Sequence, residues 1–151
     1  MGRIANYDLE LTIRSGNIDK ALMLFNELHT DEMLLKHAQG GLHGSQRDLP
    51  IRERRWFSWV ANPKEPYRSI EEAFSNWGIV DDSIVMEYNE EGDFFLSGTF
   101  EDKIGQQKLL LQQLAEVLED LIVYVKYDDY GVDIWSIQDH QFYEKLVKKY
   151  F

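Results

Sequence analysis

Two alternating segments joined by a short turn constrain the fold of this chain more than any other feature. In residues 83–103, which read SIVMEYNEEGDFFLSGTFEDK, apolar and polar side chains alternate on both sides of the sequence NEEGD. Alternation of this kind predicts strands with one buried face, and Gly92 suits the positive φ that a tight turn requires. We therefore predict an antiparallel hairpin in which Phe94, Leu96 and Phe100 share the buried face of the second strand.

Similar periodicities outline the other elements. Alternating, apolar or aromatic runs predict strands at Arg3–Ile13, Arg54–Val60, Leu121–Asp129 and Val132–Ile137. Apolar residues at helical spacing predict helices at Ile18–Ala38, with a break near Thr30, at Ser69–Gly78 and at Gly105–Asp120. The remaining segments are a long polar loop at Gln39–Glu53 and a helix or ordered tail at Gln141–Phe151.

The short helix at Ser69–Gly78 has recognisable ends. Ser69 is followed three residues later by Glu72, which is the spacing of a capping box. Gly78 suits the position just beyond a helix C-terminus, where the backbone often turns left-handed. We therefore expect the helix to begin directly after Ser69 and to end before Gly78.

The mixture of hairpins and helices, in place of a regular alternation of strand and helix, predicts an α+β fold. We expect a single domain over residues 1–151, with a mainly antiparallel sheet and helices packed on one face, in a ferredoxin-like arrangement. The other face of the sheet should be wet and acidic. The residues expected in the core are Tyr7, Leu9, Leu11, Phe94, Leu96, Leu114 and Val123.

The negative charge is concentrated in one segment. Fourteen of the 27 acidic residues but only three lysines lie between Asp81 and Asp133, so this segment alone accounts for the net charge of −11. Such a field repels nucleic acid and attracts basic surfaces. A solvated face that only keeps the protein soluble would have the same composition, so both interpretations stay open.

Composition limits the class of protein. The chain has 151 residues and is 44% hydrophobic, which is enough to bury the core of one domain. No apolar run approaches the roughly 20 residues of a membrane-spanning helix, and the first residues lack the pattern of a signal peptide. The absence of cysteine excludes disulfides, thiolate catalysis and cysteine-ligated zinc. We expect a soluble, cytoplasmic protein.

Several motifs carry a resemblance to a known group of proteins. They are RRWFSWV, SIEEAFSNWGI, the acidic hairpin with the helix after it, and VKYDDYGVDIWSI, which together span roughly Arg54 to Ile137. In these motifs the chain resembles small, uncharacterised acidic proteins from phages and mobile elements with a ferredoxin-like α+β core. The resemblance implies a phage or prophage accessory protein. Its motifs are structural, so it implies no active-site residues.

The acidic hairpin and the KYDDYGVD turn lead to a hypothesis about function. Regularly spaced carboxylates can stand in for phosphates, and a basic surface would be attracted to them. We expect an acidic protein-interaction module, plausible as a phage-encoded, anti-CRISPR-like inhibitor that occupies a basic surface of a host defence or nucleic-acid-binding complex. The expected partner-binding residues are Glu87, Glu90, Glu91, Asp93, Glu101, Asp102, Asp128, Asp129 and Asp133.

Two alternatives to this hypothesis stay open. The first is a small nuclease or nucleotide hydrolase that uses the region of His37, His43 and Arg55. Against it, the carboxylates lie in predicted turns, whereas hydrolytic sites need acids that converge in a pocket. The second is an immunity-type or structural module. We expect no enzymatic activity and no cofactor.

Motifs for metal and nucleic acid are weak. The histidines at positions 29, 37, 43 and 140 lack zinc-binding spacing, and the segment DDYGVD lacks the residue order of a calcium loop. The segment IRERRWFSW interleaves arginines with aromatic residues, as single-stranded nucleic-acid sites do. We interpret its aromatic residues as core and its arginines as partners of nearby acids. The sequence thus predicts neither a metal site nor direct contact with nucleic acid.

Overall fold

The first strand is the centre of the fold. The computed structural model describes residues 4–33, 60–127 and 131–148 of the chain. In strand β1 (Ile4–Ile13) buried residues alternate with exposed ones along nearly the whole length, as the sequence predicts. β1 pairs with β3 (Phe94–Lys103) from Ile4↔Lys103 to Ile13↔Phe94, and on its other side with β4 (Leu121–Tyr127).

In the described part of the chain, the sheet has six antiparallel strands in the order β2-β3-β1-β4-β5-β6. The remaining strands are β2 (Val85–Tyr88), β5 (Gly131–Gln138) and β6 (Gln141–Lys148). The α-helices are α1 (Ile18–Glu27), α3 (Ile70–Asn76) and α4 (Ile104–Leu114), and the short 3₁₀ segments are η1 (Ser15–Asn17) and η5 (Ala115–Val117). The chain therefore has an α+β fold, as predicted.

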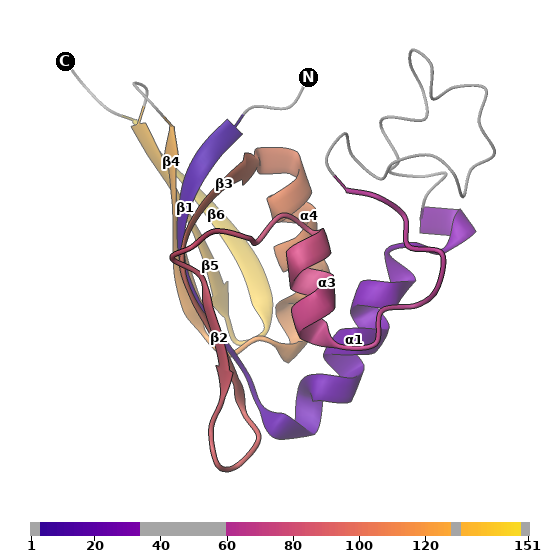
Figure 1. The fold of residues 1–151 in the computed structure, drawn as a ribbon. Helices are drawn as coiled ribbons and strands as arrows, with labels where there is room; N and C mark the ends of the chain where they lie inside the picture. The colour runs from indigo at the N-terminus through magenta and orange to yellow at the C-terminus, as the bar shows by residue number, and fades with distance from the viewer. Residues whose placement is uncertain (1–3, 34–59, 128–130, 149–151) are drawn as a thin grey trace, which may run out of the picture.

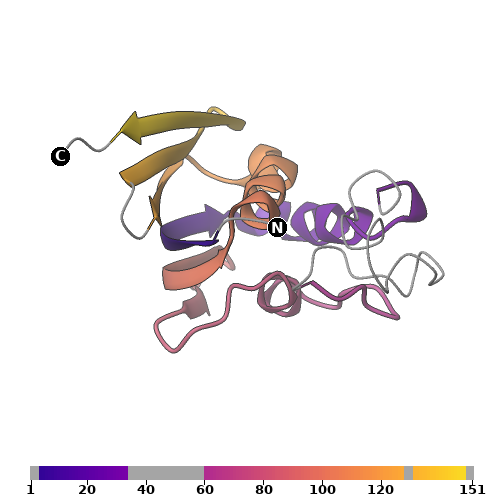
Figure 2. The ribbon, with the colours of Figure 1, turned by 90° about the horizontal axis from the view of Figure 1, so that it is seen from above.

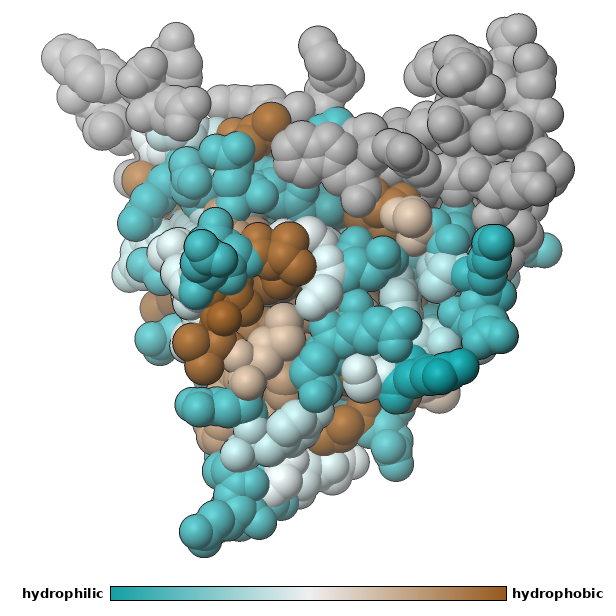
Figure 3. All heavy atoms as spheres, viewed as in Figure 1, coloured by the Kyte–Doolittle hydropathy of each residue, from teal (hydrophilic) through white to brown (hydrophobic). Residues whose placement is uncertain are grey.

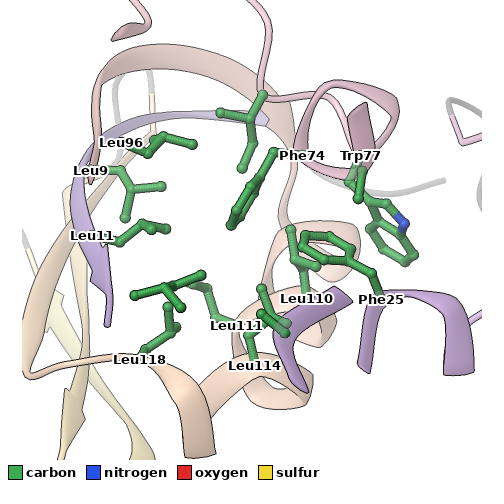
Figure 4. Packing of buried hydrophobic residues seen from close by; sticks show 14 of the residues in the cluster. Leu9, Leu11, Phe25, Phe74, Trp77, Leu96, Leu110, Leu111, Leu114 and Leu118 are labelled. Atoms are coloured by element: carbon green, nitrogen blue, oxygen red, sulfur yellow. The ribbon is translucent and has the colours of Figure 1, made fainter. Parts of the chain in front are cut away.

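The described helices cover a single face of the sheet. Figures 1 and 2 show α1, α3 and α4 together on one side of the strands. We call this side the helix face and the opposite side the open face. The seven residues expected in the core are all buried, none being more than 3% exposed. Figure 4 shows leucines of the strands meeting Phe25, Phe74 and leucines of α4 between the two layers.

The predicted ends of α3 are confirmed. The Ser69 hydroxyl accepts a hydrogen bond from the Glu72 backbone N–H at 3.2 Å. The Glu72 carboxylate accepts in turn from the N–H of Arg68, one residue before the cap, at 3.3 Å. Gly78 has φ +92°, the left-handed backbone expected just after the helix. Acidic residues in the first turn also interact favourably with the helix dipole. Both ends of this helix can therefore be predicted from the sequence.

The helix or ordered tail expected at Gln141–Phe151 is a strand where the structure describes it, so the prediction of a helix there is wrong. Gln141–Lys148 form β6, which pairs with β5 from Gln138↔Gln141 to Gly131↔Lys148. The connection is a two-residue turn in which Asp139 and His140 both have positive φ, 51° and 64°. Turns of this type are usually marked by Asn-Gly. The sequence Asp-His does not carry that mark, which is why the hairpin was missed.

Other elements differ from the predictions in length. α1 ends at Glu27, and residues 31–33 are again helical, so the break expected near Thr30 is confirmed. α4 ends at Leu114, six residues before the predicted end. The predicted loop at Gln39–Glu53 lies outside the described residues, as does all but Val60 of the strand predicted at Arg54–Val60. Val60 itself is buried and is not part of a strand.

Candidate functional site

Exposed carboxylates gather on the open face of the sheet and at its β2–β3 hairpin. β1 contributes Asp8 and Glu10, while β2 and β3 contribute Glu87 and Glu101. All four side chains are exposed. Asp8, Glu10 and Glu101 alternate with buried neighbours on strands whose other side packs against helices, and Glu87 lies on the open side of the edge strand β2. With Glu90 and Glu91 at the hairpin turn, they form the surface that we call the acidic face.

The hairpin turn places Glu90 and Glu91 in solvent. The Asn89 side-chain oxygen accepts hydrogen bonds from the N–H groups of Glu91 and Asp93, both at 2.9 Å. Gly92, with φ +84°, completes the turn. These bonds fix the backbone locally, so the turn holds its shape without help from either glutamate side chain. Both glutamates remain exposed.

The six acids of the acidic face are not in the ion pairs that the described residues form. The ion pairs found among the described residues involve other acids, such as Asp93, Glu116 and Glu119. None of them involves the six acids of the acidic face. Their negative charges are therefore available to a cation that approaches the open face or the hairpin.

Asp93 does not belong to the acidic face, although we expected it to bind a partner. Its side chain is only 4% exposed, and its carboxylate accepts hydrogen bonds from the Ser15 N–H at 2.8 Å and from Asn89. Arg14 lies 3.4 Å from the same carboxylate. The bond from the Ser15 N–H, followed by that from Asn89, lowers the pKa of Asp93 below its usual range. Asp93 therefore joins the hairpin to the start of η1.

Asp102 is also buried, being 0% exposed. One of its carboxylate oxygens accepts from the side-chain amides of Gln106 and Gln107, at 2.5 and 2.6 Å. The same two amides donate to the carbonyl of Trp77, so Asp102 links the end of α3 to the start of α4. Burial raises the pKa of Asp102. The expectation that Asp102 meets a partner is corrected: it supports the fold.

The remaining residues expected to bind a partner are Asp128, Asp129 and Asp133 of the KYDDYGVD turn. Asp133 is 7% exposed and accepts a hydrogen bond from the Tyr127 hydroxyl, so it too is a buried residue that contacts its own chain. Asp128 and Asp129 lie outside the described residues. Of the nine residues expected to bind a partner, Glu87, Glu90, Glu91 and Glu101 are exposed on the surface.

Sequence reasoning missed Asp8 and Glu10 as members of this surface. Both residues stand on the wet side of an alternating strand that the sequence predicts correctly. They were missed because β1 is far from the acidic segment in sequence, and only the pairing of β1 with β3 brings them together. Counting charges along the sequence does not show which strands lie side by side in the sheet.

The open face is not uniformly acidic, contrary to the expectation. Beyond β1, Ile122, Tyr124 and Tyr143 are 53%, 43% and 49% exposed. Lys126 and Lys145 are exposed beside them. Carboxylates therefore dominate the half formed by β1, β2 and β3, whereas the half formed by β4, β5 and β6 is mainly apolar and basic.

One histidine that sequence reasoning left without a role is central to a buried network. His29, 4% exposed, hydrogen-bonds through Nδ1 to Asn62 at 2.8 Å and through Nε2 to the Tyr67 hydroxyl at 2.7 Å. The Trp77 indole N–H donates to the same Nε2 at 3.2 Å. Asn76 donates to the Tyr67 hydroxyl at 2.6 Å. This network joins α1, the segment before α3, and α3, and its burial makes it part of the core.

The residues of the catalytic alternative lie outside the described part of the chain. These residues are His37, His43 and Arg55, and the structure does not describe their arrangement. Among the described residues, no group of three or more acids and histidines is placed to hold a metal ion. Within the same residues, no helix is long and apolar enough to cross a membrane.

Comparisons with family models, with curated proteins and with solved structures find no match to this chain. The site therefore has to be interpreted from its own geometry.

Proposed function

We propose that this protein is a non-catalytic interaction module that binds a basic surface of a protein or nucleoprotein complex through its acidic face. One observation carries the proposal: six exposed carboxylates lie along the open face of β1, β2 and β3 and at the β2–β3 turn, and none of them is in an ion pair with another described residue. Protection of a sheet edge needs only one or two charges. The excess supports a role in attracting a cationic partner.

The proposal includes a finer account of the fold. The order β2-β3-β1-β4, with α1 after β1 and α4 after β3, supports a ferredoxin-like split βαβ arrangement, to which β5 and β6 would add a hairpin. In such an arrangement the face opposite the helices is available for binding. This supports the open face, together with the hairpin at its edge, as the surface that meets the partner.

The partner that suits this surface best is a nucleic-acid-binding protein. Its basic site is built to accept spaced phosphates, which carboxylates on adjacent strands can imitate. We propose that the chain blocks that site as an anti-defence inhibitor, in line with the phage proteins that its motifs resemble. A nuclease that uses His37, His43 and Arg55, or a structural module without a partner, are the other candidates.

The test is competition. A panel of purified nucleic-acid-binding proteins is incubated with labelled DNA or RNA and increasing amounts of this protein. The proposal expects that at least one panel member releases its nucleic acid, and that E90Q/E91Q releases less. E27Q/E32Q is the matched control, because it removes two exposed charges from outside the acidic face. If the two variants released the same amount of nucleic acid, the acidic face would not be the surface that binds the partner.

A further inference from the structure

We infer that β2 is a docking edge, to which an extended cationic segment of the partner adds as a further strand of the sheet. Alternate side chains of the added strand would be apolar and would pack on the helix side of β2. Those between them would be basic and would meet the acidic face. This inference rests on the proposed function and specifies the shape and the sequence pattern of the partner segment.

The backbone of β2 supports strand addition. β2 is at one edge of the sheet and pairs with β3 on one side, and no described strand pairs with its other side. The Asn89 N–H donates to the Asp93 carbonyl at 3.1 Å. The backbone of Asn89 therefore faces the β3 side. In an antiparallel pair every second residue faces the partner strand, so Glu87 and Val85 also face β3, and the N–H and C=O groups of Met86 and Tyr88 point to the free edge. They can bond an added strand.

Apolar side chains extend along this edge. Val80, Val85 and Tyr88 are 60%, 49% and 46% exposed. Tyr88 lies on the helix side of β2, whereas Val85 lies beside Glu87 on the open side. On the helix side, a shallow hollow of about 250 Å³ is lined by Ser75, Ile79, Val80, Asp81, Ile84 and Met86. Figure 3 shows apolar atoms gathered over β2 and the segment before it. An added strand would place every second side chain on the helix side, against this hollow and Tyr88.

Charge decides which kind of strand fits. Glu87 lies on the open side of β2, Glu90 and Glu91 follow it in the turn, and Asp81 and Asp82 precede it. A second copy of the chain would bring the same five acids to the contact, so pairing of two β2 edges is disfavoured. A strand with lysine or arginine at alternate positions would neutralise them instead. The occupant is therefore a cationic segment of a different protein.

The probe is a peptide of about eight residues with alternating valine and lysine. A second peptide has the same composition, with the valines and lysines in separate blocks. M86P removes an N–H that faces the free edge while keeping the pairing with β3, and proline is tolerated at such positions. M86L is the matched control, because it changes the side chain and keeps the N–H.

The inference expects the alternating peptide to bind wild type and M86L about tenfold more tightly than M86P, and the block peptide to bind weakly. Equal binding of the alternating peptide to M86L and to folded M86P would overturn it, as would failure of this peptide to bind wild type. If M86P does not fold, hydrogen exchange on wild type decides. Amides of Met86 and Tyr88 should become protected when the peptide is added, and unchanged exchange would contradict strand addition.

These results also separate the inference from the proposed function. If both peptides bind equally and E90Q/E91Q weakens each of them, the acidic face attracts cations without strand addition. If M86P abolishes binding but E90Q/E91Q does not weaken it, β2 is a docking edge and the acidic face is not what attracts the partner.

Discussion

Asp93 and Asp102 are both carboxylates of the acidic hairpin segment, and their environments are opposite. Asp93 accepts hydrogen bonds from a backbone N–H and an amide beside Arg14, so its charged form is favoured. Asp102 lies deeper, where burial outweighs the amides that contact it, so the pKa of its carboxyl is raised. In the sequence these two acids look alike, because the sequence shows neither the hydrogen-bond partners of a side chain nor its burial.

The raised pKa of Asp102 leads to a prediction about pH. The folded protein keeps this proton to higher pH than the unfolded chain, so its contribution to stability is most favourable below about pH 4. That contribution is lost as the pH rises through the raised pKa. D102N cannot lose a proton at this position, so its stability relative to wild type should improve between pH 4 and pH 7.

Urea unfolding at several pH values measures this difference. E101Q is the control, because Glu101 is the exposed neighbour of Asp102 on the same strand. Its stability relative to wild type should change less over this pH range. If D102N kept the same difference from wild type at pH 4 and pH 7, the environment assigned to Asp102 would be incorrect.

At the level of elements, the sequence predicts well where a local rule decides and poorly where distant pairing decides. β1, the β2–β3 hairpin and α3 carry strong patterns of alternation, turn and capping, and they were placed correctly. β6 was missed because its turn lacks glycine, and because pairing with β5 selects a strand for a segment without clear periodicity. The junction of α3 and α4 could not be foreseen, since it depends on contacts across 24 to 30 residues.

Gly78 tests that junction. A Cβ at Gly78 would lie against the Asp102 carboxylate, 3.0 Å from its Cγ, and φ +92° is strained for any other residue. G78A should therefore lower the free energy of unfolding by about 1–3 kcal/mol. G105A is the comparison, because a Cβ there would meet no described atom within 4 Å apart from its chain neighbours and the backbone of its own helix, and Gly105 is in the first turn of α4.

The comparison variant has its own expected result. Alanine in a helix is favoured over glycine, so G105A should raise the free energy of unfolding by about 0.5 kcal/mol. Chemical denaturation of both variants gives the two numbers. Equal small effects at the two positions would mean that α3 and α4 do not meet as closely as the structure places them.

At the scale of the whole molecule, folding redistributes the charge that the sequence concentrates. Among the described residues, three acids of the acidic segment, Asp93, Asp102 and Asp133, are buried, and two acids of β1 join the surface. The existence of an acidic surface was predictable from composition, and four of its six members were predicted. Its boundary was not, because strand order brings β1 beside β3 and leaves β2 at the edge.

The account claims that the acidic face attracts a cationic partner, and the association rate is the quantity that tests this most directly. Binding of the alternating valine–lysine peptide is followed by stopped flow at increasing salt, for wild type, E90Q/E91Q and E27Q/E32Q. We predict that E90Q/E91Q associates several-fold more slowly than E27Q/E32Q at low ionic strength, and that the difference vanishes near 1 M salt, where the Debye length is about 3 Å. Identical rates and identical salt dependence for the two variants would contradict the account and leave the acidic face with a solubilising role only.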